Sequence, residues 1–476
     1  MSVGVPRLSS PGLIIQPADG TGHCRRSFWP RDFRPTQVGF PPGKDARRAA
    51  IPSDDHTSAM DSTDGHSEAL RRRLVRLGRR RPGAERVSLK GVPVGLGLPP
   101  GNEVPTPLGQ AFLVESWYPE DYLHGSRPLS VLLRFQTTLV AELARRPSLA
   151  DMSMQDLVFL DTETTGLAGG AGTLAFLVGL GRFHGGQFRL RQYFLRDPSE
   201  ESAMLHTLET ELAQAGGLVT FNGQTFDLPL LQMRAVVGLG RRWSHLDQPQ
   251  LDMLHPARRL WKRELPNCSL STLEQRILEV DRPEGDIAGE LIPGTYVHYL
   301  RTGDTAGIAR IFDHNAHDIL SLVVLAARVL ERHQQTNPSH LSGAEALALG
   351  RWHEAAGRLG SAEPAYRAAA ASSDPGLRVD ALCALSSHLK KVGKREQAVE
   401  VWKAWREQAP SDPQPCLDLA KYFEWHGNHV EEAFGWAQEA LVCLSHWAPS
   451  WRREELWAEV EHRLARLARK TRQRPE

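Results

Sequence analysis

Short runs of apolar residues separated by glycine and polar residues predict β-strands in the middle of the chain. VFLD, AFLVGLGRF and QFRLRQYFL follow one another between residues 156 and 195, and the last run partly alternates. A fourth run, LVTF at 218–221, comes after a helix-like segment. Short apolar runs of this kind are typical of strands in a buried sheet. Three early strands followed by alternating helix and strand predict an α/β domain with a mixed sheet.

Longer segments have apolar residues at helical spacing. Residues 129–145 and 200–215 are predicted helices, and another helix begins near Asp227. A last helix of this domain is predicted at about 305–332, where Ile319, Leu322, Val323 and Ala326 recur on one face.

The C-terminal part, residues 340–476, is predicted to be all helical and repetitive. Small and aromatic residues recur with offsets of 36 and 35 residues, close to the tetratricopeptide period. The three sets are Ala362, Tyr366 and Ala369; Ala398, Trp402 and Trp405; and Ala433, Ala437 and Ala440. We therefore expect two to three tetratricopeptide-like repeats, whose concave face suits a protein partner.

The N-terminal residues 1–85 lack a sustained apolar period. Residues 1–59 are rich in Pro, Gly, Ser and Arg and are predicted to be disordered. Seven of the eleven residues 71–81 are arginine, which fits a solvated basic helix and a nucleic-acid contact equally well. Met60 opens an acidic and then amphipathic segment, so we expect that translation can start there.

The remaining boundaries follow from these patterns. We expect residues 86–150 to form an extension that packs on the α/β domain. That domain spans 151–335, ahead of the repeats at 340–476.

Composition excludes several classes of protein. Lys and Arg total 57 and Asp and Glu total 56, so net charge indicates no partner. The five cysteines form no CxxC pair, which argues against a disulfide framework or a zinc site. No apolar run has the roughly 20 residues that a membrane helix needs, and no secretory signal is apparent. These features predict a cytoplasmic protein without a membrane partner.

Two carboxylates end the first predicted strand. Asp161 and Glu163 lie in LVFLDTETTGL and point to the same face, because side chains alternate along a strand. Alone, such a pair is more often solvated than functional. Asp227, in VTFNGQTFDLPLL, is either a helix N-cap or a third acid of the same site. His314 and Asp318, in IFDHNAHDIL, are four residues apart and share one helix face.

The four acids Asp161, Glu163, Asp227 and Asp318 would repel one another unless cations neutralised them. Oxygen ligands select Mg²⁺ or Mn²⁺ rather than zinc. Two such ions can clamp a phosphodiester, one activating water and the other stabilising the leaving oxygen. The sequence therefore predicts a two-metal site on a rigid strand platform.

DTETTG, NGQTFDLP and HNAHD resemble the three motifs of the DEDD superfamily of ribonuclease-H-fold 3′–5′ exonucleases. LDTETTGLAGGAGTLAFLVGLG, FNGQTFDLPLL and DMLHPARRLWKRELPNCSLSTLE are more narrowly similar to the bacterial YprB-type ribonuclease-H-like family, whose members often carry tetratricopeptide repeats. The resemblance covers about residues 86–335 and, less specifically, the tail. It implies a five-stranded mixed sheet flanked by helices, with the four acids as metal ligands.

One position departs from the superfamily pattern. Its members place His five residues or Tyr four residues before the last Asp, to orient the attacking water. Here Asp313 and His314 occupy those positions. We expect His314 to be the base or water-orienting group, with His317 as the second candidate.

Nucleic-acid contacts are predicted at two places. Thr164, Leu167 and Asn222 lie within the first two motifs. The helical segment ARRLWKR presents Arg258, Arg259 and Lys262, which are either a solvated basic face or a backbone contact, with Trp261 as a possible stacking surface. Cys268 is expected to be buried rather than nucleophilic, and Asp252 has no evident metal role.

Three functions agree with these features. The first is a 3′–5′ exonuclease with two Mg²⁺ or Mn²⁺ ions, acting on single-stranded DNA or RNA. The second is a repeat scaffold that binds nucleic acid with little or no cleavage. The third is an endonuclease that uses the same site.

Overall fold

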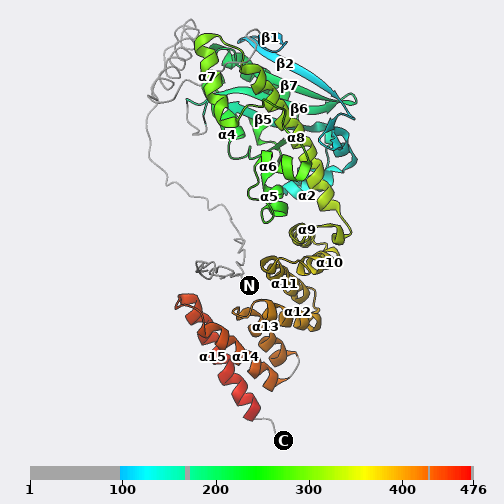
Figure 1. Cartoon of the computed structure of the whole chain (residues 1–476), viewed down its shortest axis with the longest axis vertical. Helices are drawn as coiled ribbons and strands as arrows, with labels where there is room; N and C mark the ends of the chain where they lie inside the picture. The colour runs from blue at the N-terminus through cyan, green and yellow to red at the C-terminus, as the bar shows by residue number, and fades with distance from the viewer. Residues whose placement is uncertain (1–96, 167–171, 427–428, 473–476) are drawn as a thin grey trace, which may run out of the picture. The chain divides into compact units, whose positions relative to one another are not determined.

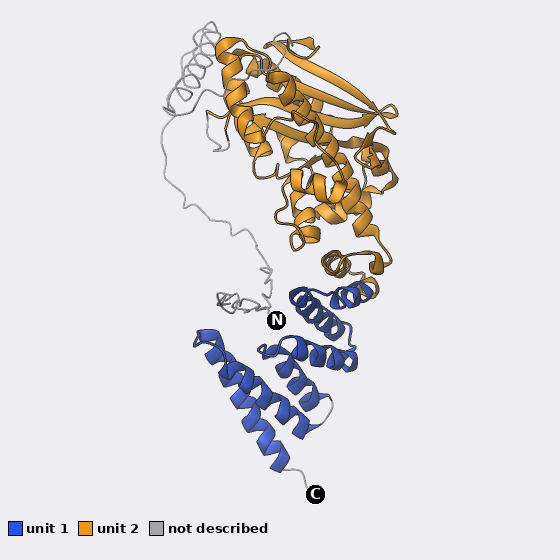
Figure 2. Cartoon of the chain, in the orientation of Figure 1, with its two compact units in different colours: residues 1–43, 362–476 blue, residues 44–361 orange. Residues whose placement is uncertain are grey.

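The computed structural model describes residues 97–166, 172–426 and 429–472. Our predictions for the N-terminal segment 1–85, for Met60 and for Leu167 therefore lie outside the described residues. The chain divides into two compact units (Figure 2). Within the described part, one unit comprises residues 97–361 and the other residues 362–472.

The larger unit is built on a mixed sheet whose strands follow the order β1-β2-β7-β6-β5-β8-β9 (Figure 1). The strands are β1 (Asn102–Thr106), β2 (Gly109–Pro119), β5 (Leu157–Thr164), β6 (Ala175–His184), β7 (Gln187–Phe194), β8 (Gly217–Thr220) and β9 (Gln250–Asp252). The pairings from β1 to β5 are antiparallel, whereas β5, β8 and β9 are parallel. This confirms the predicted mixed sheet.

The predicted domain, residues 151–335, contributes five strands as expected, β5 to β9, and the described part of the chain extends this sheet to seven strands. The two additional strands, β1 and β2, come from the segment ahead of the predicted domain. β2 pairs along β7 from Phe112 to Pro119, and its residues Ala111–Val114 are buried. An edge that would otherwise expose unpaired backbone groups is covered in this way.

Helices cover both faces of the sheet. On one face lies α8 (Ile308–Gln334). It packs closely on β6, because a Cβ added at Gly181 would lie only 2.7 Å from Ile319 Cγ2. On the other face lies α3 (Glu201–Leu212), whose Glu211 forms ion pairs with Arg189 and Arg191 of β7. α4 (Asp227–Leu239) packs against α3 through the buried Arg234–Glu201 pair. The three predicted helices of this region are thus confirmed.

The predicted helix at 129–145 is divided in the structure. Leu129–Arg134 is a 3₁₀ segment, and α2 (Thr137–Ala144) begins only after two extended residues. The Thr137 hydroxyl donates to the carbonyl oxygens of Ala150 and Met152, at 3.0 and 2.9 Å. These bonds tie the start of α2 to the segment that leads into β5.

The other elements of this unit connect or flank the sheet. They are β3 (Leu123–His124), β4 (Arg127–Pro128), α5 (Leu254–Trp261), α6 (Leu270–Leu273), the π-helical segment Glu274–Leu278, α7 (Ile292–Thr302) and α9 (Gly343–Ala355). α7 places Tyr296 in a stacked contact with Phe176, with 3.9 Å between ring centroids.

The second unit is entirely helical in its described part. Its helices are α10 (Leu359–Ala370, from residue 362), α11 (Pro375–Lys391), α12 (Arg395–Gln408), α13 (Gln414–Trp425), α14 (Val430–Ser445) and α15 (Trp451–Arg472). The three repeated residue sets fall on α10, α12 and α14, and all nine side chains are buried. Small residues at these positions allow neighbouring helices to approach closely. The tetratricopeptide type itself stays a prediction.

The structure also bears on the membrane question. Among the helices described, we find none with both the length and the apolar character required to cross a bilayer.

Candidate active site

β5 carries the first two acids into the centre of the sheet. Its residues Leu157–Leu160 are buried, and the four residues that follow, Asp161–Thr164, are half-buried. Asp161 pairs in register with Gly179 of β6. The backbone position of both acids is therefore fixed by strand pairing rather than by a loop, which suits a preorganised site.

Asn315 of α8 orients the first acid. Its side chain is fully buried, and its Nδ2 donates to Asp161 Oδ2 at 2.8 Å. Gln192 of β7 donates to Asn315 Oδ1 at 3.0 Å, so the amide is held from both ends. A side chain at Gly179 would prevent this approach, because its Cβ would lie 2.3 Å from Asn315 Oδ1. Gly179 is thus required for close packing of α8 on β6.

Asp227 is the first residue of α4 and accepts a hydrogen bond from the Thr162 hydroxyl. The turn that delivers it is held by the buried carboxylate of Asp252, which accepts from the backbone N–H of Asn222 at 2.7 Å and of Leu254 at 3.0 Å. Asn222 has a positive φ of 65°, which an asparagine tolerates better than most residues. Asp252 therefore stabilises the turn that precedes Asp227, a role that we did not predict from the sequence.

Asp318 of α8 faces a cation of the protein. Arg282 Nη2 donates to Asp318 Oδ1 at 2.6 Å. The same guanidinium binds Glu274 and Asp286, and its Nη1 lies 3.0 Å from His314 Nδ1. Arg282 is 36 residues away from Asp318 along the chain, so no local pattern indicates this contact.

The four acids interact electrostatically. Burial and then the charges of the other three acids raise the pKa of Asp161 well above its usual value. Burial, followed by the charges of Asp318 and Asp227, does the same to the pKa of Glu163. Burial raises the pKa of Asp227 and of Asp318 to about 6 each. The structure thus brings the four predicted acids together, at a site where their ionised forms are unfavourable without added cations.

The carboxylate oxygens of the four acids are suitable ligands for a divalent cation, but in this structure they are not arranged around one point. Over residues 97–166, 172–426 and 429–472, no three Asp, Glu, His or Cys side chains converge closely enough to hold a metal ion. Asp161, Asp227 and Asp318 each direct one oxygen to a protein donor, namely Asn315, Thr162 and Arg282. Each keeps a second carboxylate oxygen, the donor type that Mg²⁺ and Mn²⁺ prefer. Binding therefore requires the carboxylates to turn towards the ion.

The two candidate histidines differ in their surroundings. His314 Nδ1 lies 2.9 Å from Asp286 Oδ1, and its Nε2 lies 3.7 Å from Asp318 Oδ2. The ring is thereby oriented with one nitrogen towards the acid cluster. His317 packs its ring against His124 at 4.7 Å between centroids, and burial lowers its pKa. The geometry favours His314 over His317.

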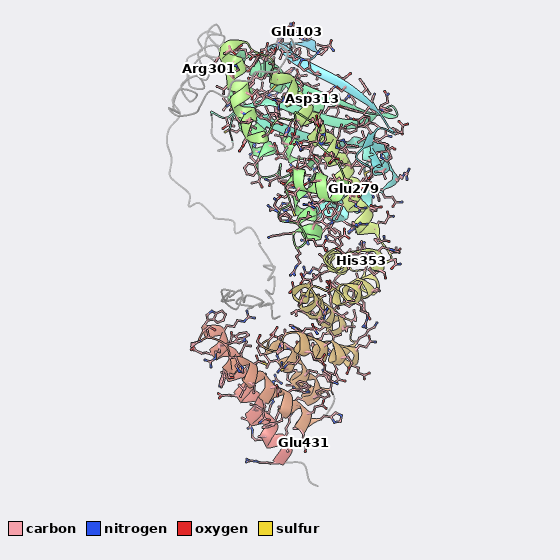
Figure 3. The ribbon with its side chains drawn as sticks, viewed as in Figure 1. Glu103, Glu279, Arg301, Asp313, His353 and Glu431 are labelled. Atoms are coloured by element: carbon pink, nitrogen blue, oxygen red, sulfur yellow. The ribbon has the colours of Figure 1, made fainter. Side chains whose placement is uncertain are left out.

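Asp313 lies five residues before Asp318, at the position where the resemblance to DEDD exonucleases implies a histidine. It is exposed on α8 (Figure 3). Burial of part of its surface and the charge of Asp286 raise its pKa.

The predicted nucleic-acid contacts fall in two places. Thr164 lies at the end of β5, where its hydroxyl donates to the Gly166 carbonyl at 3.2 Å, and Asn222 lies at the turn after β8. Arg258 and Arg259 of α5, and Lys262 just after it, are all exposed. α5 follows β9, which is separated from β5 by β8. The structure therefore does not bring these three cations into the acid cluster.

The prediction that Trp261 offers a stacking surface is wrong. Its side chain is 1% exposed, and its Nε1 donates to Glu345 Oε1 of α9 at 2.9 Å. The apolar side of α5 packs on α9, so the indole is part of the core. Cys268 is buried as expected, and burial raises its pKa.

Comparison with known proteins agrees with this arrangement. Residues 158–330 match the RNase_H superfamily model. The chain is 30% identical over 365 residues to a protein of Bacillus subtilis (strain 168) described as uncharacterized protein YprB, covering 74% of this chain and 84% of that relative. The matched superfamily region contains all four acids and most of the strand and helices that carry them. The chain therefore belongs to the YprB family and contains a domain of the RNase H superfamily.

Proposed function

We propose that the protein is a metal-dependent 3′–5′ exonuclease that acts on single-stranded DNA or RNA. A nuclease-type function follows from the RNase H superfamily domain. The observation that supports the finer proposal is the meeting of four acids from β5, α4 and α8. Burial raises the pKa of each, and the charges of other acids of the set raise the pKa of Asp161 and Glu163 further.

The residues have distinct roles in this proposal. Asp161, Glu163, Asp227 and Asp318 would hold two Mg²⁺ or Mn²⁺ ions, which when bound supply charge stabilisation of the leaving oxygen and activation of water. Thr162 and Asn315 keep the carboxylates of Asp227 and Asp161 in place through the hydrogen bonds described above.

His314 would orient the attacking water and accept its proton. Its Nε2 faces the acid cluster, and Nδ1 is held by Asp286 and Arg282. An imidazole held in one orientation is suited to this role. Thr164 and Asn222 flank the acids and are proposed to contact the strand being cleaved, together with Leu167. The basic residues Arg258, Arg259 and Lys262 would contact its backbone farther away.

End-dependence tests the proposed mode of cleavage. Metal-free protein would be supplied with Mn²⁺ and given linear and circular single strands of the same sequence, as DNA and as RNA. An exonuclease shortens the linear strand and leaves the circle intact. Nicking of the circle by the wild-type protein, but not by Asp318→Asn, would establish an endonuclease instead. Binding of the strands without cleavage would favour the scaffold.

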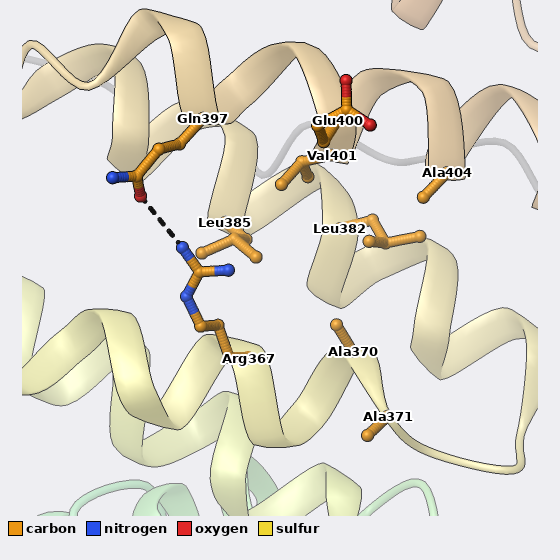
Figure 4. Close-up of a pocket in the computed structure, with 9 residues that line it drawn as sticks. All are labelled: Arg367, Ala370, Ala371, Leu382, Leu385, Gln397, Glu400, Val401 and Ala404. Atoms are coloured by element: carbon orange, nitrogen blue, oxygen red, sulfur yellow. Dashed lines mark hydrogen bonds between the residues drawn. The ribbon is translucent and has the colours of Figure 1, made fainter.

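The helical unit supports a second proposal, that it binds an apolar helix face of a protein partner. A groove of about 580 Å³ lies between α10, α11 and α12 (Figure 4). Its walls are largely small or apolar, namely Ala370, Ala371, Leu382, Leu385, Val401 and Ala404, with Arg367, Gln397 and Glu400 beside them. Replacing Ala404 by Arg should abolish capture of a partner while leaving cleavage of short oligonucleotides unchanged. Retained partner binding by a folded Ala404→Arg protein would contradict this proposal.

A further inference from the structure

Arg282 lies where three carboxylates from three different segments meet. Its Nε and Nη2 donate to the two oxygens of Glu274, at 2.7 and 3.1 Å. Its Nη1 donates to Asp286 Oδ2 at 3.0 Å, and its Nη2 also donates to Asp318 Oδ1 at 2.6 Å. The side chain of Arg282 is 21% exposed and that of Glu274 only 1% exposed. The guanidinium is thus a partly buried cation at the border of the acid cluster.

The three contacts are not equivalent. Glu274 and Asp286 lie outside the set of four acids, and Glu274 engages the guanidinium in a two-pronged ion pair, the strongest geometry for such a contact. Asp286 is itself held by His314 and by the backbone N–H of Ile287, at 2.9 Å each. Asp318 is joined to Arg282 through a single nitrogen. Arg282 can therefore lose the contact with Asp318 and still remain in place.

A divalent cation bound by Asp318 would have to share that carboxylate with Arg282. Two positive charges that approach the same oxygen repel each other strongly in a partly buried site. Without a cation, Arg282 supplies the positive charge nearest to Asp318 in the described part of the site. The same arginine therefore stabilises the ionised Asp318 carboxylate in the metal-free protein and weakens metal binding.

We propose that Arg282 is an internal counter-ion of the site, which holds Asp318 in the metal-free protein and releases its Oδ1 when a divalent cation binds. This makes Arg282 a positioning residue, and the inference rests on the proposed metal-dependent function. It predicts that metal affinity is set partly by competition with a protein cation, and not by the four acids alone.

The test is a calorimetric titration of Mn²⁺ into the metal-free full-length protein. Arg282→Gln removes the competing charge and should tighten Mn²⁺ binding by about tenfold or more. Arg282→Lys keeps the charge but not the two-pronged contact with Glu274, and it should tighten Mn²⁺ binding clearly less than Arg282→Gln does. Arg310→Gln is the matched control. Arg310 donates to the carbonyl oxygens of Gly285 and Asp286, in the same segment, and touches none of the four acids.

Folding of the variants can be controlled separately. Arg282→Gln leaves Glu274 buried without its cation, which lowers the melting temperature of the metal-free protein. The double variant Glu274→Gln/Arg282→Gln removes that buried charge as well, and should show the same tightening of Mn²⁺ binding.

The outcomes separate the two proposals. Unchanged or weaker Mn²⁺ binding by the folded single or double variant would overturn the role of Arg282, while the proposed function would stand. Failure of the wild-type protein to bind Mn²⁺ at all would overturn both.

Discussion

Replacing Asp318 by Asn distinguishes two roles of this residue, that of a metal ligand and that of a member of a surface ion pair. Burial raises the pKa of Asp318 to about 6, above the value of 3.8 for a free side chain. Its ionised form is therefore less favourable in the folded protein than in the unfolded chain. Asn keeps the size of the side chain and an oxygen that can accept from Arg282, but it removes the charge.

The sign of the effect on stability follows from proton linkage. Because the folded pKa is raised, the folded protein binds more protons than the unfolded chain between the two values, and stability falls as pH rises through this window. At pH 7.5 the ionisation of Asp318 costs on the order of 3 kcal/mol, from 1.36 kcal/mol per pKa unit. Without metal, Asp318→Asn should be more stable than wild type by up to about this amount. The gain should shrink to below about 1 kcal/mol at pH 4, where Asp318 is protonated in the folded protein and the unfolded chain is near its own midpoint of 3.8.

Activity should change in the opposite direction. Loss of a metal ligand should lower Mn²⁺-dependent turnover by at least about 100-fold, or roughly 2.7 kcal/mol of barrier. Asp313→Asn is the matched control, because Asp313 is exposed on the same helix and should retain activity. The assays are chemical denaturation of metal-free protein at several pH values and cleavage of an end-labelled single strand. An Asp318→Asn protein that cleaves at the wild-type rate, or whose stability difference does not depend on pH, would refute this reasoning.

Three further predictions follow from particular contacts. Asn315→Ala removes the donor to Asp161 and one of the two acceptors of Gln192 Nε2, which keeps the Phe312 carbonyl. It should destabilise the metal-free protein by about 1–3 kcal/mol in denaturant titrations, and wild-type stability would contradict the buried amide contact. The double variant Arg258→Gln/Lys262→Gln should keep the melting temperature of the wild type. The slope of log affinity for single strands against log salt concentration should fall in magnitude by about 0.7 per lost phosphate contact. An unchanged slope would exclude both residues from the interface. A chain ending at residue 361 should fold and cleave short oligonucleotides. A chain ending at residue 339 also loses Glu345, the acceptor for the buried Trp261, and should melt at a lower temperature. Equal melting temperatures would show that α9 adds no stability.

The acids could be predicted from sequence because each lies on, or at the boundary of, an element that periodicity identifies. Asp161 and Glu163 end an apolar strand, Asp227 begins a helix, and Asp318 lies on a strongly amphipathic helix. Each of these elements can be identified from the residues of its own segment. Their meeting at one place is then a consequence of the mixed sheet.

The residues that hold the acids could not be predicted in the same way. Arg282 lies in an irregular segment and reaches Asp318 only through the tertiary fold. Asn315 had a weak signal, since it stands three residues before Asp318 on the same helix. Trp261 was misassigned because the charges around it on α5 masked its apolar side, which packs on α9.

The two strands that extend the sheet ahead of the predicted domain were missed for a related reason. β1 and β2 pair with each other as a hairpin, but no local pattern indicates that this hairpin joins the sheet. On its other side β2 pairs with β7, which begins at Gln187, far along the chain. Local pattern predicts a strand's character, whereas the partner of an edge strand depends on long-range pairing.

The central claim is that the four acids form a metal-dependent nuclease site. Its most direct test is cleavage of a 5′-labelled single strand by protein stripped of metal, measured as Mn²⁺ is added, with Asp161→Asn in parallel. We predict no cleavage without Mn²⁺, progressive shortening from the 3′ end with it, and loss of cleavage in the variant. Cleavage that persists without divalent ions, or that survives Asp161→Asn unchanged, would contradict the account.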